Sequence, residues 1–224
     1  MDFGLLVKLA YGCAREVGRL PKGLVEDSMK KEFRYDTNLE TVKRVLVPMF
    51  YKESLVGLSI GKGNRAFKAE LFNSILQLAE KVDNATLTNQ DIREKIREIV
   101  KETNVSVGQA QKVINVYLKY YCILRDKAGL IKELDCPIDE GIAELVWKGL
   151  STEEKEDLGN CLGLQEIGAS LNFTFFKEIT KLKNMDYRLY EILQEQLEKI
   201  GSGIRLKPDL EIYDKGRIEG FVLL

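Results

Sequence analysis

Two lysines on one predicted helix, and an aspartate at the start of the next, are the residues of this chain best suited to chemistry. The segment from Gly108 reads GQAQKVINVYLKYY, and Lys119 follows Lys112 by seven residues. Seven residues are close to two turns of an α-helix, so both ammonium groups point the same way, about 10 Å apart along the axis. Asn115 falls on the same face. These three residues are expected to form a narrow polar stripe on a helix whose other side is buried.

The aspartate is Asp139, in the sequence LDCPID. A carboxylate just after Pro-Ile suits the first turn of a helix, where the helix macrodipole favours negative charge. Two interpretations stay open. Asp139 either takes part in chemistry, or is only an N-cap with Cys136 and Ile138 as packing residues. The lysines likewise either face a pocket or belong to a solvated helix face.

The composition narrows the chemistry. The 224 residues include no histidine, which excludes Ser-His-Asp and Cys-His catalysis and histidine-ligated metal sites. Any general base must therefore be a carboxylate, lysine, tyrosine or cysteine. The length suits one globular domain or two small ones with a substantial core.

The four cysteines, Cys13, Cys122, Cys136 and Cys161, contain no pair at the two-residue spacing of zinc or redox motifs. They are expected to be buried free thiols in a reducing compartment. The apolar run near the start is interrupted by charged residues and is too short to span a bilayer. We therefore expect a cytoplasmic (intracellular) protein without a metal or cofactor.

Charge is spread unevenly along the chain. The net charge is −1, but residues 1–68 hold 13 Lys and Arg against 8 Asp and Glu, whereas residues 133–157 hold 9 acidic residues against 2 lysines. The basic part is compatible with a nucleic-acid partner, although such asymmetry is also common on solvated surfaces.

Hydrophobic periodicity predicts a mainly α protein. Thr88 with Asp91, and Ser151 with Glu154, have the spacing of helix N-caps. Period-two patterning after residue 207 predicts a C-terminal β-hairpin. We expect one helical domain over 1–224, or two lobes at 1–85 and 86–200 with the hairpin at 208–224. The expected helices cover residues 38–58, 66–82, 89–100, 109–125, 173–182 and 186–200, with a short one after 151.

Helices 91–101 and 109–125, joined by a turn ending in Gly108 and followed by Pro137-Ile138-Asp139, resemble the catalytic segment of the helix-hairpin-helix DNA glycosylases. The archaeal 8-oxoguanine DNA glycosylases are the most similar. Their pattern is a nucleophilic lysine, a second lysine seven residues later and a Pro-Val-Asp motif, which match Lys112, Lys119 and Asp139 here.

The segment also departs from the family. Val105-Ser106-Val107-Gly108 stands where the family has a Gly-hydrophobic-Gly hairpin, and Lys112 stands four residues after the glycine rather than two. Both departures weaken the expectation that this hairpin binds DNA phosphate.

The resemblance implies a helix-hairpin-helix-like bundle that removes a damaged base from double-stranded DNA. Lys112 would attack the sugar C1′, Asp139 would assist, and Lys119, Asn115 and Gly108 would contact the substrate. A bifunctional enzyme would also have AP-lyase activity through a Schiff base. An attacking lysine must be neutral, which requires partial desolvation or a nearby cation.

Two other functions fit the same sequence. The first is a non-catalytic helical module that binds nucleic acid or another protein, as the small net charge and the altered hairpin favour. The second is a purely structural helical protein that associates with itself.

Overall fold

The computed structural model describes residues 65–103, 105–124, 127–164 and 171–209, and this part of the chain is mainly helical, without a strand. The helix predicted at 38–58 lies outside it, as does the predicted hairpin except for residues 208 and 209, which belong to a helical turn. The elements are α5 (Arg65–Asp83), α6 (Asn89–Glu102), α7 (Val107–Leu124), the 3-10 helix η2 (Ala128–Glu133), α8 (Glu140–Gly149), α9 (Thr152–Cys161), α10 (Phe173–Ile179), α11 (Tyr187–Ile200) and α12 (Lys207–Asp209).

Side chains that bond free backbone N–H groups set several helix starts. Thr88 and Asp91 form a reciprocal capping box at α6, and Ser151 and Glu154 form one at α9. Asp186 caps α11 through the N–H of Leu189. These starts confirm the predictions from sequence.

Helix α10 is shorter than the helix predicted at 173–182 and ends at Ile179. Asn184 donates to the carbonyl of Glu178 at 2.9 Å and so caps the last turn. The carbonyl of Leu182 accepts from the Ser106 hydroxyl. These two contacts hold the residues after 179 in a turn, so α10 does not continue to residue 182.

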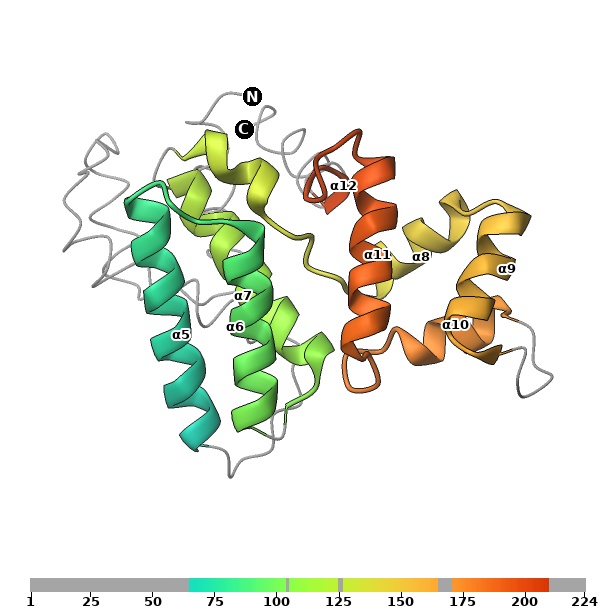
Figure 1. Ribbon diagram of the computed structural model, residues 1–224, viewed down its shortest axis with the longest axis horizontal. Coiled ribbons are helices and arrows are strands. Elements are labelled where there is room, and N and C mark those ends of the chain that lie inside the picture. The colour runs from blue at the N-terminus through green and yellow to red at the C-terminus, as the bar shows by residue number, and fades with distance from the viewer. Residues whose placement is uncertain (1–64, 104, 125–126, 165–170, 210–224) are drawn as a thin grey trace, which may run out of the picture.

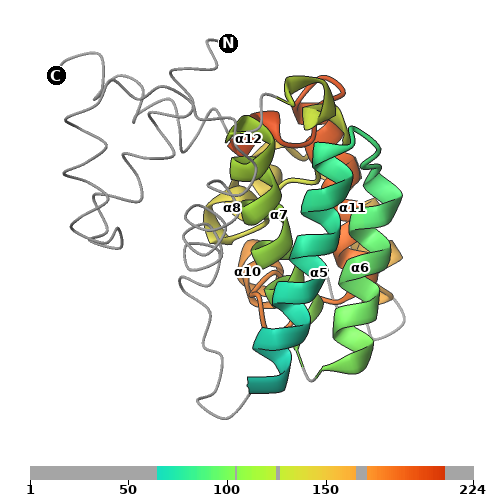
Figure 2. The same cartoon turned by 90° about the vertical axis from the view of Figure 1, so that its left-hand side faces the viewer.

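Helix α7 is the centre of the described structure. It packs against α5 and α6 on one side and against α11 on another. Figure 1 shows α11 between this group and α8 to α10, and Figure 2 shows α5 and α6 beside α7 in the perpendicular view. Val113, Ile114, Tyr117, Leu118 and Tyr121 are all fully buried on it. A helix buried on most of its circumference is a core helix rather than a surface helix.

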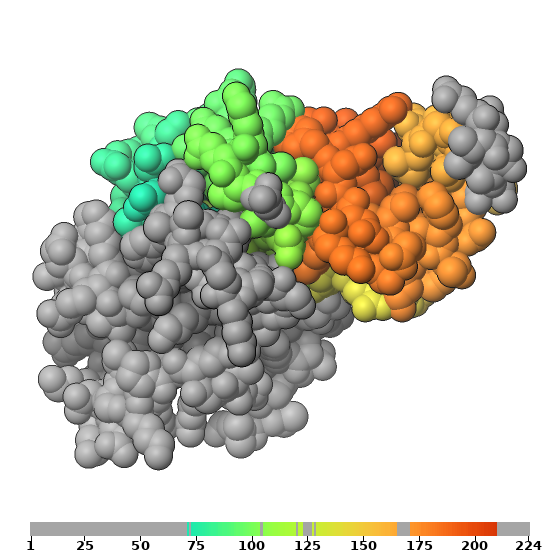
Figure 3. All heavy atoms as spheres, turned by 90° about the horizontal axis from the view of Figure 1, so that it is seen from below, coloured from blue at the N-terminus to red at the C-terminus, as the bar shows by residue number. Residues whose placement is uncertain are grey.

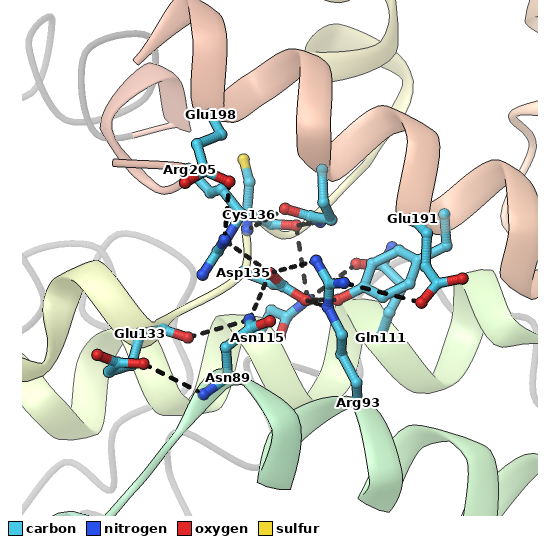
Figure 4. A network of polar contacts seen from close by, with 12 residues as sticks. Asn89, Arg93, Gln111, Asn115, Glu133, Asp135, Cys136, Glu191, Glu198 and Arg205 are labelled. Carbon is cyan, nitrogen blue, oxygen red and sulfur yellow. Dashed lines mark hydrogen bonds and ion pairs between the residues drawn. The ribbon is translucent and has the colours of Figure 1, made fainter. Parts of the chain in front are cut away.

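A buried carboxylate ties these helices together (Figure 4). Asp135, which is fully buried, accepts hydrogen bonds from Asn89 at 2.7 Å, Arg93 at 3.1 Å and the Tyr190 hydroxyl at 2.7 Å. Arg205 Nε lies 2.9 Å from the same carboxylate, as an ion pair whose N–H is not aligned for a hydrogen bond. The segment before α8 is thereby fixed to α6, α11 and the chain after α11.

Gly108, in the first turn of α7, lies against the backbone of the turn after α10. A Cβ atom at this position would lie 2.3 Å from the carbonyl oxygen and 2.7 Å from the Cα of Leu182. Real Cβ atoms do not approach backbone atoms so closely, so only glycine fits without a shift of one backbone. This contact joins the 105–108 hairpin to the α10–α11 side of the molecule.

The Gly108→Ala variant should therefore be less stable than the wild type. We expect the free energy of unfolding to fall by about 1–3 kcal/mol, the usual cost of overpacking, even though alanine is the better helix former. Urea unfolding followed by circular dichroism measures the change. Gly129→Ala is the matched control, because a Cβ there meets no atom within 4 Å. Equal stability of the two variants would contradict the role assigned to Gly108.

Candidate functional site

The sequence leaves open whether the polar stripe of α7 faces water or a pocket, and in the structure the stripe is only partly exposed. Asn115 is 1% and Lys119 4% exposed, whereas Lys112 is partly buried. The reason is the central position of α7, since α11 and the segment before α8 cover the side that periodicity alone leaves free. Within the described residues, no hydrogen bond or ion pair engages the Lys112 side chain.

Lys119 forms a buried ion pair with Asp209. Its Nζ lies 2.6 Å from Asp209 Oδ2, and the two side chains are only 5% and 4% exposed. This short, charge-assisted hydrogen bond connects α7 to α12 across 90 residues of sequence. The Lys119 ammonium therefore has a protein carboxylate as its partner, and the role predicted for it, donation to a DNA base, stays a prediction.

Asn115 takes part in the buried network around Asp135. Its amide nitrogen donates to Gln111 at 3.3 Å and to the Tyr190 hydroxyl at 3.1 Å. Burial, followed by the proximity of Asp135, raises the pKa of Tyr190 well above its usual value, so this hydroxyl stays protonated and donates to Asp135. Asn115 thus serves as a buried link between α7 and α11.

Two glutamines hold the backbone of the extended segment 136–138. The amide of Gln111 donates to the carbonyl of Ile138 at 2.7 Å and accepts from its N–H at 3.1 Å. Gln194 of α11 makes the same two-way contact with Cys136, at 2.7 and 2.9 Å. All four residues are buried. The segment thereby satisfies its backbone groups inside the core without belonging to a sheet.

Asp139 is the N-cap of α8, as one of the two interpretations of the sequence predicted. Its side chain accepts a hydrogen bond from the N–H of Ile142 at 3.1 Å, and the residue is partly exposed. Its position follows from the two hydrogen bonds between Gln111 and Ile138. Ile138 directly precedes Asp139, and Gln111 directly precedes Lys112. Lys112 and Asp139 are thus sequence neighbours of two residues in direct contact.

The hairpin before α7 uses its polar groups within the protein. The Ser106 N–H donates to Gln109 Oε1 and the Gln109 N–H donates to Ser106 Oγ, both at 3.2 Å. This is a capping box with the pattern Ser-x-x-Gln. With Gly108 against Leu182, this first turn of α7 is closely packed on the protein.

The cysteines and acidic residues form no metal site in the described ranges. Cys122 and Cys136 are buried free thiols as predicted, whereas the prediction was wrong for Cys161, which is exposed near the end of the short helix α9; Cys13 lies outside the described residues. Burial raises the pKa of Cys122 to about 12. Burial and then the nearby Asp209 carboxylate raise the pKa of Cys136, so both thiols stay protonated.

Sequence reasoning missed Gln111, Gln194, Asp135 and Asp209. Gln111 and Gln194 occupy positions where helical periodicity requires an apolar residue, and a polar residue at such a position signals a buried hydrogen bond. Asp209 gave no such signal, because it was assigned to the start of a hairpin.

Comparison of the chain with models of protein families, with curated proteins and with solved structures finds no match. In the described ranges, no helix combines the length and the apolar character needed to cross a membrane.

The buried ion pair between Lys119 and Asp209 generates a stability prediction. Lys119→Met should lower the free energy of unfolding by about 3–5 kcal/mol, because it leaves a buried carboxylate without its counter-ion. The double variant Lys119→Met/Asp209→Leu should regain most of that loss, since both charges are then absent. Urea unfolding of the single and double variants measures the coupling. Wild-type stability of the single variant would show that the pair is not buried in solution.

Proposed function

We propose that this protein is a DNA base-excision glycosylase that acts on a damaged base in double-stranded DNA, with Lys112 as the nucleophile and Asp139 as the assisting carboxylate. The observation that supports this proposal best is the contact between Gln111 and Ile138 at 2.7 and 3.1 Å. It brings the turn that carries Lys112 next to the N-terminus of α8, where Asp139 lies.

The exposure of the candidate residues supports the same division of roles. Lys112 and Asp139 are partly exposed, so a substrate can reach them, whereas Asn115 and Lys119 are buried. Because the Lys119 ammonium is held by Asp209, Lys112 is the lysine of the stripe that is accessible for attack. In this proposal Asn115 and Lys119 hold α7 in place beneath the site, through Tyr190 and Asp209 respectively. Gly108 allows α7 to pack closely against Leu182.

Lys112 and Asp139 have separate roles in the proposed reaction. The neutral Lys112 amine attacks the sugar C1′, and the bond from C1′ to the base breaks as the base leaves with the electron pair and takes up a proton. Asp139 stabilises the positive charge that develops on the sugar and accepts a proton from the attacking amine. Opening of the sugar ring gives a Schiff base at Lys112, from which elimination cleaves the strand if the enzyme is bifunctional.

A second candidate is a helical nucleic-acid-binding or protein-interaction module without chemistry. The hairpin favours it, because the N–H groups of Ser106 and Gln109 are already bonded and Gly108 is covered by Leu182. A module of this kind would bind DNA with strong salt dependence but would release no base.

Borohydride trapping separates the two candidates. Wild-type protein should form a covalent adduct with a duplex that carries an abasic site, because borohydride reduces the Schiff base to a stable amine. Lys112→Gln should form none, while Lys95→Gln, which changes a partly buried lysine of α6 paired with Glu98, should trap like the wild type. An adduct that persists in Lys112→Gln would remove Lys112 as the nucleophile. Salt-dependent binding of the same duplexes without any adduct would favour the module.

Asp139→Asn separates capping from chemistry. Asparagine caps a helix about as well as aspartate, so the stability of this variant should stay within about 0.5 kcal/mol of the wild type. The rate of base release should fall by about 10²- to 10⁴-fold, the usual contribution of a general acid or base. Single-turnover assays on a duplex with an oxidised guanine measure the rate.

Asp186→Asn is the matched control for this experiment, since Asp186 caps α11 in the same way. It should leave both stability and rate nearly unchanged. A normal rate for Asp139→Asn would reduce Asp139 to a helix cap.

A further inference from the structure

The end of α10 and the turn after it lie beside the candidate site. Lys177 of α10 forms an ion pair with Glu140, the residue after Asp139. The backbone of Leu182, five residues after Lys177, lies against Gly108 in the first turn of α7. This stretch therefore runs from the start of α8 to the start of α7. Figure 3 shows the green atoms of α6 and α7 next to the orange atoms that follow residue 170, on one face of the molecule.

Together with the bonds between Gln111 and Ile138, these contacts join α7, α8 and α10 into a ring. Lys112 directly follows Gln111, and Asp139 directly follows Ile138. Lys112 also lies four residues after Gly108, so it is about 6 Å further along the same side of α7. The last residues of α10 and the turn after them therefore border the surface that carries both candidate residues.

This border is basic. Residues 177–183 contain three lysines, Lys177, Lys181 and Lys183, against one acidic residue, Glu178. The side chains of all three lysines are exposed. We refer to these three lysines as the lysine rim.

The ammonium groups of the lysine rim are available to an anion from outside the protein. Lys177 and Lys181 pair with Glu140 and Glu178, and all four side chains are at least 48% exposed. Ion pairs this exposed contribute at most about 1 kcal/mol, so a phosphate can replace the glutamate. Lys183 is exposed, and among the residues that the structure describes no hydrogen bond or ion pair involves its side chain.

The opposite side of the ring is acidic. Residues 140–161, which form α8, α9 and their connection, hold six acidic residues and two lysines. Negative charge of this density repels the phosphates of a nucleic acid. A duplex that reaches Lys112 should therefore approach over α10 and the turn after it rather than over α8 and α9.

We propose that the lysine rim binds the phosphate backbone of double-stranded DNA beside the reacting nucleotide. The proposal rests on the proposed function and adds the surface that holds the strand while Lys112 and Asp139 act. Lysines that neutralise phosphates supply affinity and fix the position of the duplex without reading its sequence. The hairpin before α7, where the N–H groups of Ser106 and Gln109 bond within the protein, then needs no phosphate contact of its own.

The salt dependence of DNA binding tests the lysine rim. Each phosphate contact contributes about 0.9 to the slope of log affinity against log salt concentration, so the triple variant Lys177→Gln/Lys181→Gln/Lys183→Gln should have a slope smaller by about 2.7. Between about 50 and 200 mM salt, the affinity of the wild type should consequently fall about 40-fold more than that of the variant. Fluorescence anisotropy of a labelled duplex that carries an unreactive abasic analogue measures both slopes. A wild-type slope in the variant would overturn the proposal.

The triple variant Lys81→Gln/Lys148→Gln/Lys199→Gln is the matched control. It also removes three exposed lysines, each of which pairs with an acidic residue outside the ring. Its slope should equal that of the wild type. An equal loss of slope in both variants would assign the effect to net charge and would also overturn the lysine rim.

Trapping on an abasic duplex separates failure of the lysine rim from failure of the glycosylase. With protein at saturating concentration, the lysine-rim variant should form as much adduct as the wild type, because Lys112 and Asp139 are unchanged. Loss of the adduct under these conditions would contradict a role in binding alone. Absence of an adduct in the wild type would contradict the glycosylase, whereas the difference in slope would still identify the lysine rim as a DNA-binding surface.

Discussion

The arrangement of the described helices depends on one buried carboxylate. Removing a charge from water costs several kcal/mol unless cations and hydrogen-bond donors replace the solvent, and Asp135 receives them from three parts of the chain: α6, α11 and the residues after α11. Glu191 and Glu198 lie on the outer side of Arg93 and Arg205. Each of these two arginines therefore lies between the buried Asp135 carboxylate and a more exposed glutamate of α11.

This network determines where the candidate site lies. With Asp135 fixed, the next residues must run extended through the core, and the side-chain amides of Gln111 and Gln194 satisfy their backbone groups. The side-chain bonds specify one register, because each glutamine bonds both the N–H and the carbonyl of one residue of the segment. The start of α8, and Asp139 with it, is therefore set by buried hydrogen bonds rather than by the conformation of a loop.

The sequence predicted the local features and not the long-range ones. The capping residues Thr88, Ser151 and Asp186 identify helix starts because their contacts span three residues. The burial of Lys119 could not be predicted, since its partner Asp209 lies 90 residues away and an exposed lysine has the same periodicity. Likewise, the length of α10 depends on a long-range contact, the hydrogen bond from the Ser106 hydroxyl to the carbonyl of Leu182. Spacing within one helix specifies which residues share a face, but only packing decides what covers that face.

The same reasoning explains why Lys112 and Lys119, two lysines of one stripe, differ in burial. Seven residues bring Lys112 and Lys119 to the same side of α7, but α12 reaches only the second, where Asp209 neutralises its charge. A buried lysine without a carboxylate would be costly, so the ion pair and the burial of Lys119 require each other. Lys112 lies two turns nearer the N-terminus of α7 and is partly exposed. Its side chain keeps contact with solvent and so needs no carboxylate partner, whereas the buried Lys119 does.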